Sequence, residues 1–355
     1  MNKRNDWFNN YQSIDNKNGQ RDLNYRKQFF NNKDFENKTV LDIGCNMGQM
    51  CKYAFQLGAN NIIGVDYDQS VIKKANSLLT EEEKNKITYL VDDVDNSAFY
   101  TNLNKVDTIL LLSVIETLEL QNRFGMLSKL YSLCNVMYFE GHVNSIYSNL
   151  LKMLLNYTIF TTIEFKGIQY DNNNFKNQNK GRHVFRCSNE IFSAIDAQKQ
   201  ILDLLEKNNN YIITVVGQGG VGKSHFKHEL IKYINKNSNK FKFDKNNIKY
   251  TNENNIIKSD KNIIVDNSDL ICIIDDTKLN DDTIDSINSK YKCIIYFDYR
   301  AMEYLNKNVN TVFIMNYEIK SRFKNRKEKY MYDRSPIINE TNYKYIENIF
   351  HINKY

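Results

Sequence analysis

A glycine-containing turn near the start of the chain, VLDIGCNMG, has the residue types needed to bind a nucleoside. An apolar run leads into Asp42, and Gly44 and Gly48 precede the helix-like segment QMCKYAFQLG. Glycines between a strand and a helix let the backbone approach a ligand closely, and a helix N-terminus favours polar groups there. Further along, GVDYD ends a second apolar run with Asp66, whose carboxylate can accept both hydroxyls of a ribose. The two segments together predict a nucleoside site, although the pattern GxGxxG is not met.

A second turn, GQGGVGKS, has the residue types that bind the phosphates of a nucleotide. It fits the pattern GxxxxGK[ST] once in the chain and lies between the apolar run YIITVV and the helix-like HFKHELIKYI. Backbone N–H groups of such a loop surround the phosphates, Lys223 would neutralise the outer phosphates, and the Ser224 hydroxyl would bind Mg²⁺. The predicted ATP-binding residues are Gly217, Gly219, Gly220, Val221, Gly222, Lys223 and Ser224.

An acidic residue is the second requirement of such a phosphate site. LICIIDD is an apolar run that would deliver Asp275 to the metal ion or to its water, with Asp276 as a substitute. Ser224 and Asp275 are therefore the predicted Mg²⁺ ligands. The sequence argues against a GTPase, because no glycine follows Gly222 to form a DxxG switch and no NKxD motif occurs.

The apolar runs predict an α/β fold. Over residues 39–140 they alternate with helical stretches, which predicts a parallel sheet with helices on both faces. Two more runs, TIFTTIEFKGIQY and RHVFRCS, are joined by a polar loop and predict an antiparallel hairpin at one edge of that sheet. A helical stretch over residues 190–209 ends in an asparagine run, and a second series of apolar runs then extends from YIITVVG to TVFIMN.

Length and composition indicate two soluble domains. The chain has 355 residues, of which 41% are hydrophobic and 25% charged, and its net charge of +6 is too small to indicate nucleic-acid binding by itself. We expect a cytoplasmic protein, because no apolar run could span a bilayer and the first residues lack the apolar core of a signal peptide. The six cysteines are scattered without a CxxC pair, which indicates free thiols.

At the first turn the sequence resembles the class I S-adenosylmethionine-dependent methyltransferases, over roughly residues 35–189. VLDIGCNMG is similar to the first motif of that family, GVDYD and VDDVD to the next two, and LLLSVIETL to the fourth. The resemblance implies a Rossmann-like sheet of seven strands and S-adenosyl-L-methionine as cofactor. It also implies the cofactor-binding residues: Asp42, Gly44, Cys45 and Gly48 at the methionine and ribose end, Asp66 at the ribose, Tyr67 against the adenine, Asp93 and Val94 at the adenine edge, and Ser113 and Val114 beside the methionine.

The resemblance leaves the methyl acceptor open. Methyl transfer needs an acceptor aligned close to the sulfonium methyl, and an oxygen acceptor also needs a base. The candidates are Glu116, Glu140 and His142, each expected at the carboxyl end of a strand, and Glu116 and His142 are the predicted catalytic residues. Glu116 and Glu119 are similar to the paired glutamates of metal-dependent RNA-end methyltransferases, but Leu120 replaces the histidine expected there.

The region after TVFIMN resembles the lid of P-loop nucleotide and small-molecule kinases. Arg322 and Arg326 are similar to the lid arginines that close over the transferred phosphate and stabilise charge on its oxygens. The predicted catalytic residues of phosphoryl transfer are Lys223, Asp275, Arg322 and Arg326. Asp266 and Asp298 both end apolar runs and stay open as alternatives for the base that activates the phosphoryl acceptor.

Four segments follow from these patterns: an N-terminal helical segment at 1–34, a methyltransferase domain at 35–189, a linker helix at 190–209 and a P-loop kinase-like NTPase domain at 210–355. The expected activities are methyl transfer and ATP-dependent phosphoryl transfer, on a sugar, a nucleotide or a polynucleotide, with a small-molecule substrate as the expected partner. Two alternatives stay open. One is a methyltransferase regulated by an AAA-like P-loop module, and the other is an RNA- or DNA-end modifying methyltransferase-kinase, which the basic stretch KSRFKNRKEKYMYDR would serve.

Overall fold

The chain forms two compact units, Met1–Asn189 and Glu190–Tyr355, and each is described by itself. The computed structural model describes residues 21–101, 103–115, 122–143, 145–170, 181–207, 211–216, 223–243, 263–266, 270–275, 287, 289–297, 310–316 and 348–353. In this part of the chain no helix is both long enough and apolar enough to cross a membrane.

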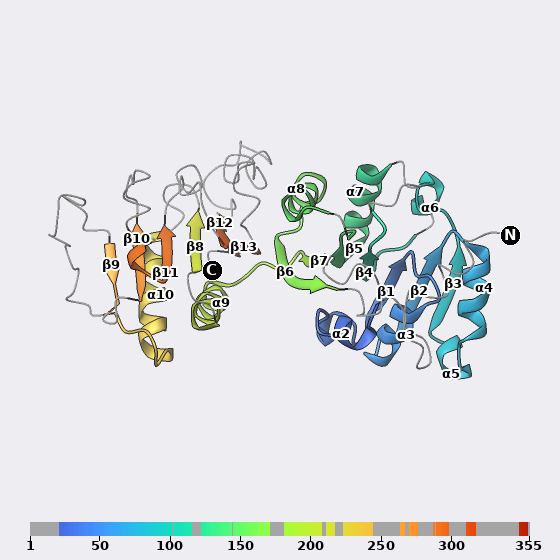
Figure 1. Ribbon diagram of the computed structural model, residues 1–355, viewed down its shortest axis with the longest axis horizontal. Helices are drawn as coiled ribbons and strands as arrows, with labels where there is room; N and C mark the ends of the chain where they lie inside the picture. The colour runs from blue at the N-terminus through green and yellow to red at the C-terminus, as the bar shows by residue number, and fades with distance from the viewer. Residues whose placement is uncertain are drawn as a thin grey trace, which may run out of the picture. The chain divides into compact units, whose positions relative to one another are not determined.

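The first unit is built on a twisted sheet whose described strands follow the order β3-β2-β1-β4-β5-β7-β6 (Figure 1). Strands β1 to β5 are parallel, whereas β7 runs antiparallel to both β5 and β6. The predicted parallel sheet and its antiparallel edge hairpin are therefore confirmed. The strands are Thr39–Ile43 (β1), Asn61–Asp66 (β2), Ile87–Val91 (β3), Val106–Leu112 (β4), Cys134–Glu140 (β5), Thr162–Gln169 (β6) and Arg182–Ser188 (β7).

Helices cover both faces of this sheet, as the continuous burial of its central strands requires. Strands β1 and β4 are buried over nearly their whole length, which is the pattern of parallel strands covered on two sides. Figure 1 shows α7 and α8 on the opposite side of the sheet from α2 and α3. The helices are Leu23–Lys27 (α2), Gln49–Gln56 (α3), Gln69–Ser77 (α4), Glu81–Lys84 (α5), Ser97–Thr101 (α6), Arg123–Leu133 (α7) and Tyr147–Tyr157 (α8), with a 3₁₀ turn at Asn32–Asp34 (η1).

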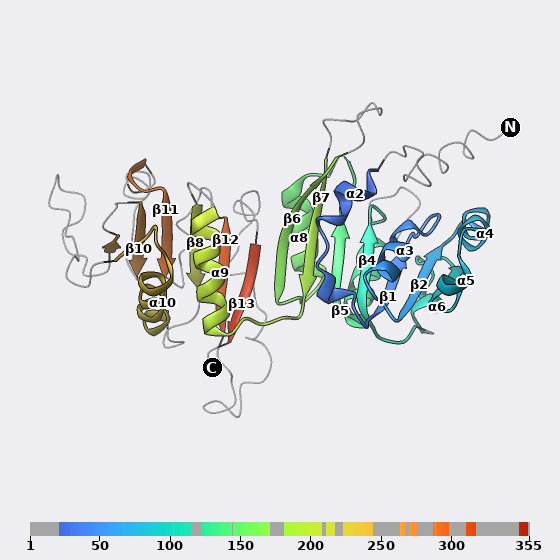
Figure 2. The same cartoon turned by 90° about the horizontal axis from the view of Figure 1, so that it is seen from below.

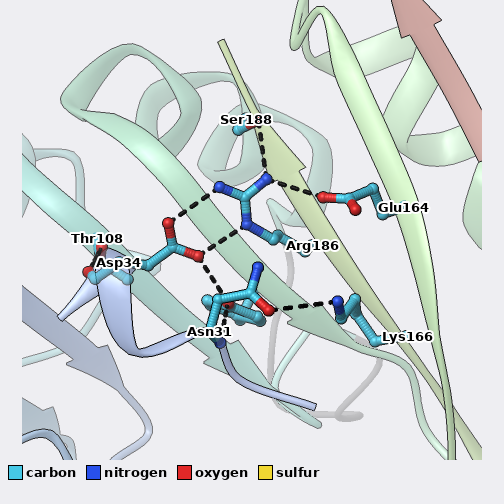
Figure 3. Close-up of polar contacts among 8 residues, drawn as sticks. Asn31, Asp34, Thr108, Glu164, Lys166, Arg186 and Ser188 are labelled. Atoms are coloured by element: carbon cyan, nitrogen blue, oxygen red, sulfur yellow. Dashed lines mark hydrogen bonds and ion pairs between the residues drawn. The ribbon is translucent and has the colours of Figure 1, made fainter. Parts of the chain in front are cut away.

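The segment before β1 packs on the sheet with aromatic side chains and with a buried ion pair. The ring of Phe30 lies against those of Phe35 and Tyr138, with ring centres 5.9 and 4.7 Å apart. The Asp34 carboxylate pairs with both Nε and Nη2 of Arg186 in β7, at 2.7 and 2.9 Å, and it also accepts the hydroxyl of Tyr138 at 2.7 Å. Figure 3 shows the Arg186 guanidinium between Asp34 and Glu164, so that the segment is tied to β5, β6 and β7.

The second unit has a sheet whose described strands follow the order β13-β12-β8-β11-β10-β9 (Figure 2). All neighbouring strands are parallel except β9, which runs antiparallel to β10 at one edge. The strands are Tyr211–Val216 (β8), Ile263–Val265 (β9), Ile271–Asp275 (β10), Cys293–Phe297 (β11), Thr311–Asn316 (β12) and Asn348–Asn353 (β13). The expected α/β architecture is present, and β13 is a strand that the sequence did not predict.

The helix predicted as a linker is part of the second unit. Helix α9, Ala194–Lys207, buries Ile201 and Leu205 in the same core as Ile213 and Val215 of β8. Helix α10, Lys223–Asn237, contributes to this core as well. The predicted amphipathic helix is present, and its apolar face covers the sheet of the second unit. The predicted run NIKYTNE and the basic stretch at 320–334 lie outside the described residues.

Candidate functional site

The glycine turn after β1 adopts the backbone conformation that only glycine tolerates easily. Gly44 and Gly48 have φ angles of 69° and 77°, and Gly48 is the N-cap of α3. The backbone N–H groups of Gly44 and Cys45 donate to the Val65 carbonyl of β2, at 2.8 and 3.0 Å. A Cβ added at Gly48 would lie 1.9 Å from the Tyr89 hydroxyl, so the Tyr89 side chain packs directly against the turn. The turn is therefore held in place at the carboxyl ends of β1 and β2 by β2 and by Tyr89 of β3.

Asp66 lies at the carboxyl end of β2, directly beside this turn. Its Oδ2 accepts the backbone N–H of Asn46 at 3.0 Å, and its Oδ1 accepts that of Asp68 at 3.1 Å. Burial raises the pKa of Asp66, and these backbone hydrogen bonds work in the opposite direction. Tyr67, the next residue, has 60% of its surface exposed. Asp66 is therefore held beside the turn, and the next residue in the chain has an exposed aromatic ring.

Asp42 is buried beneath the turn. Burial raises its pKa to about 7, although the Cys51 thiol, which donates to Oδ2 at 3.3 Å, and the nearby Arg26 both act to lower it. Cys45 is buried too, and all six cysteines are free, as the sequence predicts. Asp42 thus lies on the buried side of the glycine turn.

The loops after β3 and β4 contain the remaining predicted cofactor residues. Asp93 is exposed and accepts the N–H of Asp95 at 2.9 Å, and the Val94 carbonyl accepts the Tyr100 hydroxyl at 2.6 Å. Ser113 has a φ of 62°, and a Cβ added at Gly44 would meet Val114 at 2.6 Å. The loop after β4 therefore touches the glycine turn.

Strand order brings these loops to one edge of the sheet. Strands β3, β2, β1 and β4 are consecutive neighbours and parallel, so their carboxyl ends lie side by side. In open α/β sheets, ligands bind along this edge. The predicted cofactor residues, which are spread over the sequence from 42 to 114, are thus collected at a single edge.

Glu140, a candidate base, is an ion-paired residue. It is fully buried at the end of β5, where Arg26 Nη2 lies 2.6 Å from Oε2 and Arg21 Nε lies 3.7 Å from Oε1. The Ser113 hydroxyl donates to the same carboxylate. Burial acts to raise the pKa of Glu140, but the two arginines, Ser113 and Arg182 outweigh it and the pKa is lowered. A carboxylate stabilised in this way is a poor proton acceptor, so Glu140 is not suited to be the base.

Of the other two candidate bases, His142 lies in the described part of the chain. His142 is half-buried just beyond β5, and its backbone N–H donates to the Ser145 hydroxyl at 2.8 Å. Glu116 and its neighbour Glu119 lie outside the described residues. Within the residues that are described, no three histidine, cysteine, aspartate or glutamate side chains are grouped as a metal site would require.

In the second unit the predicted phosphate loop connects a parallel strand to a helix. Strand β8 ends at Val216 and α10 begins at Lys223, while residues 217–222 lie outside the described part. Lys223 is half-buried in the first turn of α10, a helix of 15 residues. Ser224 follows it in the same turn. The strand-loop-helix order is the one that a phosphate-binding loop needs.

Strand order separates the predicted metal ligand Asp275 from this loop by one strand. β8 pairs with β11 and β12, and β11 lies between β8 and β10, the strand that ends in Asp275. Neighbouring strands are about 4.8 Å apart, which places β10 about 10 Å from β8. Asp298, which directly follows β11 in the sequence, lies outside the described residues, as do Arg322 and Arg326.

Asp266, a candidate phosphoryl-acceptor base, has a structural role. It is 2% exposed, and its Oδ1 accepts the backbone N–H groups of Leu270 and Ile271, each at 2.9 Å. These bonds, with the bond from its own N–H to the Ile271 carbonyl, join the end of β9 to the start of β10. A side chain engaged in this way stabilises a hairpin turn.

Comparison with known proteins gives a clear match in the first unit. A family model described as a methyltransferase domain matches residues 40–136. Protein arginine N-methyltransferase 1 of Dictyostelium discoideum is 39% identical over 72 residues, which is 20% of this chain and 21% of that protein. The protein of the same name from Saccharomyces cerevisiae strain ATCC 204508 / S288c is 43% identical over 60 residues, 17% of each chain. The chain thus spans about a fifth of the length of the curated relatives it matches.

Solved structures with a similar fold have low sequence identity. The bifunctional kinase-methyltransferase WbdD is 20% identical over 52% of this chain and 44% of its own, with a TM-score of 0.42. An S-adenosylmethionine-dependent methyltransferase from Mesorhizobium loti is 20% identical over 32% of this chain and 50% of its own, with a TM-score of 0.26.

The fold of the first unit and its family match agree with each other. Its strand order ends in an antiparallel hairpin, its glycine turn and Asp66 share one edge, and the family match begins inside β1. Residues 40–136 therefore match a methyltransferase domain, and the described sheet agrees with the Rossmann-like fold that the sequence resemblance implied.

Proposed function

We propose that the first unit transfers a methyl group from S-adenosyl-L-methionine to an acceptor bound at the same edge. The observation that supports the proposal is the hydrogen bond between Asp66 and the glycine turn, because it holds a carboxylate beside the left-handed backbone of Gly44 and Gly48. When bound, the cofactor supplies an electrophilic methyl on a positively charged sulfur. The protein has to bind, orient and desolvate the two reactants.

Each predicted residue has a defined part in this proposal. Asp66 accepts the ribose hydroxyls, Tyr67 packs against the adenine, and the Gly44 turn and the Ser113–Val114 loop enclose the methionine part. His142 is the candidate base for an oxygen acceptor, because Glu140 is held as an ionised partner of two arginines. The acceptor we propose is a small molecule, a sugar or a nucleotide.

The first experiment is calorimetry with S-adenosylhomocysteine, the product of the cofactor. Asp66→Ala should weaken its binding by about tenfold or more, since hydrogen bonds to a charged group are among the stronger ones. Asp68→Ala is the matched control, because Asp68 is two residues after Asp66 in the chain. Its carboxylate caps α4 by accepting the backbone N–H groups of Ser70 and Val71. Equal affinity of Asp66→Ala and wild type would contradict the proposed ribose site.

A second candidate function, ATP-dependent phosphoryl transfer, is favoured by one observation in the second unit. The only segment of the sequence that fits GxxxxGK[ST] lies between β8 and the 15-residue α10, and Lys223 is in the first turn of that helix. We propose that this loop binds Mg²⁺ and ATP, with Ser224 as a metal ligand and with Arg322 and Arg326 closing over the phosphates.

The ligand of the second unit is tested with Mg·ATP and two lysine variants of α10. Lys223→Ala should abolish binding, while Lys232→Ala should not, because Lys232 is exposed and pairs with Glu229 at 2.7 Å. If both variants bind Mg·ATP like wild type, the loop is not a nucleotide site. Phosphorylation of the acceptor would support a kinase, and an ATP effect on methyl transfer without a phosphorylated product would support a regulatory module. Salt-dependent binding of oligonucleotides would favour a polynucleotide end as substrate.

A further inference from the structure

Glu140 joins two segments that are far apart in sequence. One is the segment before β1, through Arg21 and Arg26, and the other is the loop after β4, through Ser113. Arg21 Nη2 also donates to the Ser113 hydroxyl at 3.3 Å, so that these side chains form a closed set of contacts. We refer to Arg21, Arg26, Ser113 and Glu140 as the Glu140 cluster.

Because the Glu140 cluster is buried, its stability depends strongly on the Glu140 carboxylate. Arg21, Arg26 and Glu140 are each 2% exposed or less. Removing one partner of a buried ion pair leaves an uncompensated charge, which costs far more than a surface pair contributes. Loss of the charge on Glu140 would therefore take from Arg21 and Arg26 the carboxylate that both of them contact.

The cluster also controls the backbone beside the cofactor edge. Ser113 has left-handed φ of 62°, a conformation that a serine keeps only when its surroundings enforce it. Its N–H donates to the Glu140 carbonyl at 2.9 Å, while its hydroxyl donates to the Glu140 carboxylate. Because Val114 touches Gly44, a shift of Ser113 would move the wall of the glycine turn.

The same N-terminal segment has a second buried ion pair, which serves as an internal comparison. Asp34 pairs with Arg186 and contacts Tyr138 of β5, two residues before Glu140 (Figure 3). Two residues of a strand span about 7 Å, so this pair lies one row further from the carboxyl edge. It anchors the segment without touching Ser113.

We propose that Glu140 is a positioning residue for methyl transfer: it holds Arg21, Arg26 and Ser113 together at the carboxyl ends of β4 and β5, so that cofactor affinity depends on its negative charge. The inference rests on the proposed methyltransferase function. Glu140 would thus act without taking part in the chemical step. Through Arg21 and Arg26, the segment before β1 would contribute to the cofactor site.

The test compares Glu140→Gln with Asp34→Asn in the full-length protein. In each variant a buried carboxylate that pairs with arginine is replaced by a neutral amide. Both variants should therefore have a lower melting temperature than wild type. Binding of S-adenosylhomocysteine, measured by calorimetry well below each melting temperature, should be weakened about tenfold or more by Glu140→Gln and within about twofold of wild type for Asp34→Asn.

The outcomes separate this inference from the proposed function. If wild type does not bind S-adenosylhomocysteine, both are overturned. If wild type binds and the two variants keep or lose affinity equally, only the positioning role of Glu140 is overturned. Should Glu140→Gln fail to fold, Arg21→Lys takes its place, because lysine keeps the charge but has a single nitrogen in place of the two that contact Glu140 and Ser113. Arg21→Lys should weaken binding about threefold to tenfold, and unchanged affinity would overturn the inference.

Discussion

Replacing Asp42 by asparagine should change the way in which the stability of the first unit depends on pH. Asp42 is 3% exposed, and burial raises its pKa from 3.8 to about 7. Asparagine has nearly the same shape and keeps an oxygen that can accept the Cys51 thiol. The two proteins therefore differ mainly in whether residue 42 can ionise.

The direction of the effect follows from proton binding. Between pH 4 and 7 the folded protein keeps a proton on Asp42 that the unfolded chain has lost, so the free energy of unfolding falls as the pH rises. The fall is about 1.4 kcal/mol per pH unit, which sums to about 4 kcal/mol over the whole interval and to about 3 kcal/mol between pH 5 and 8. Asp42→Asn lacks this pH-dependent contribution to the free energy of unfolding. The contributions of the other ionisable groups are the same in both proteins and cancel in the comparison.

The assay has to report on the first unit alone, because the two units can unfold separately. Cys51 is completely buried in the first unit, so labelling of its thiol across a urea series, read out by peptide mass, follows the unfolding of that unit. Wild type should lose stability relative to Asp42→Asn from pH 5 to 8. A difference between the two proteins that stays constant over this range would refute the argument that burial sets the pKa of Asp42.

Three more substitutions test other parts of the structure. Gly48→Ala should destabilise the first unit in denaturant by more than the roughly 1–2 kcal/mol of a left-handed alanine, because its Cβ would also collide with Tyr89; a melting temperature equal to wild type would contradict the geometry of the turn. Asp266→Ala should cost about 1–3 kcal/mol of stability in the second unit and leave Mg·ATP affinity unchanged, and a loss of affinity in the folded variant would reinstate Asp266 as a site residue. Asp298→Asn should weaken Mg²⁺-dependent ATP binding more than Asp275→Asn, since β11 and not β10 adjoins β8; the reverse ranking would speak for Asp275.

Local sequence patterns were sufficient to predict the glycine turn and its partners. Gly44, Gly48 and Asp66 are each marked by the residues immediately around them, at the end of an apolar run. A parallel sheet then brings such strand ends together without further information, because its strands share one direction. This explains why one sequence was enough to predict that these residues share one edge of the sheet, and the antiparallel hairpin was predicted from its two apolar runs in the same way.

The role of Glu140 could not be predicted in the same way. Arg26 and Glu140 are 114 positions apart, and a glutamate at a strand end has the same local pattern whether it is a base or an ion-pair partner. Its role depends on a segment before β1 that has no motif of its own. Asp266 is a different case: an aspartate followed by asparagine and serine is a turn pattern, and it could have been recognised from sequence.

The position of α9 determines where the chain can be divided. A fragment ending near residue 209 would retain α9 without the strand whose side chains bury Ile201 and Leu205, so an apolar helix face would be left in water and would promote aggregation. The complementary fragment would begin at β8 with one side of its core uncovered. Cutting after Asn189 keeps each of the two hydrophobic cores in one fragment, so we expect that boundary to suit separate production of the two halves.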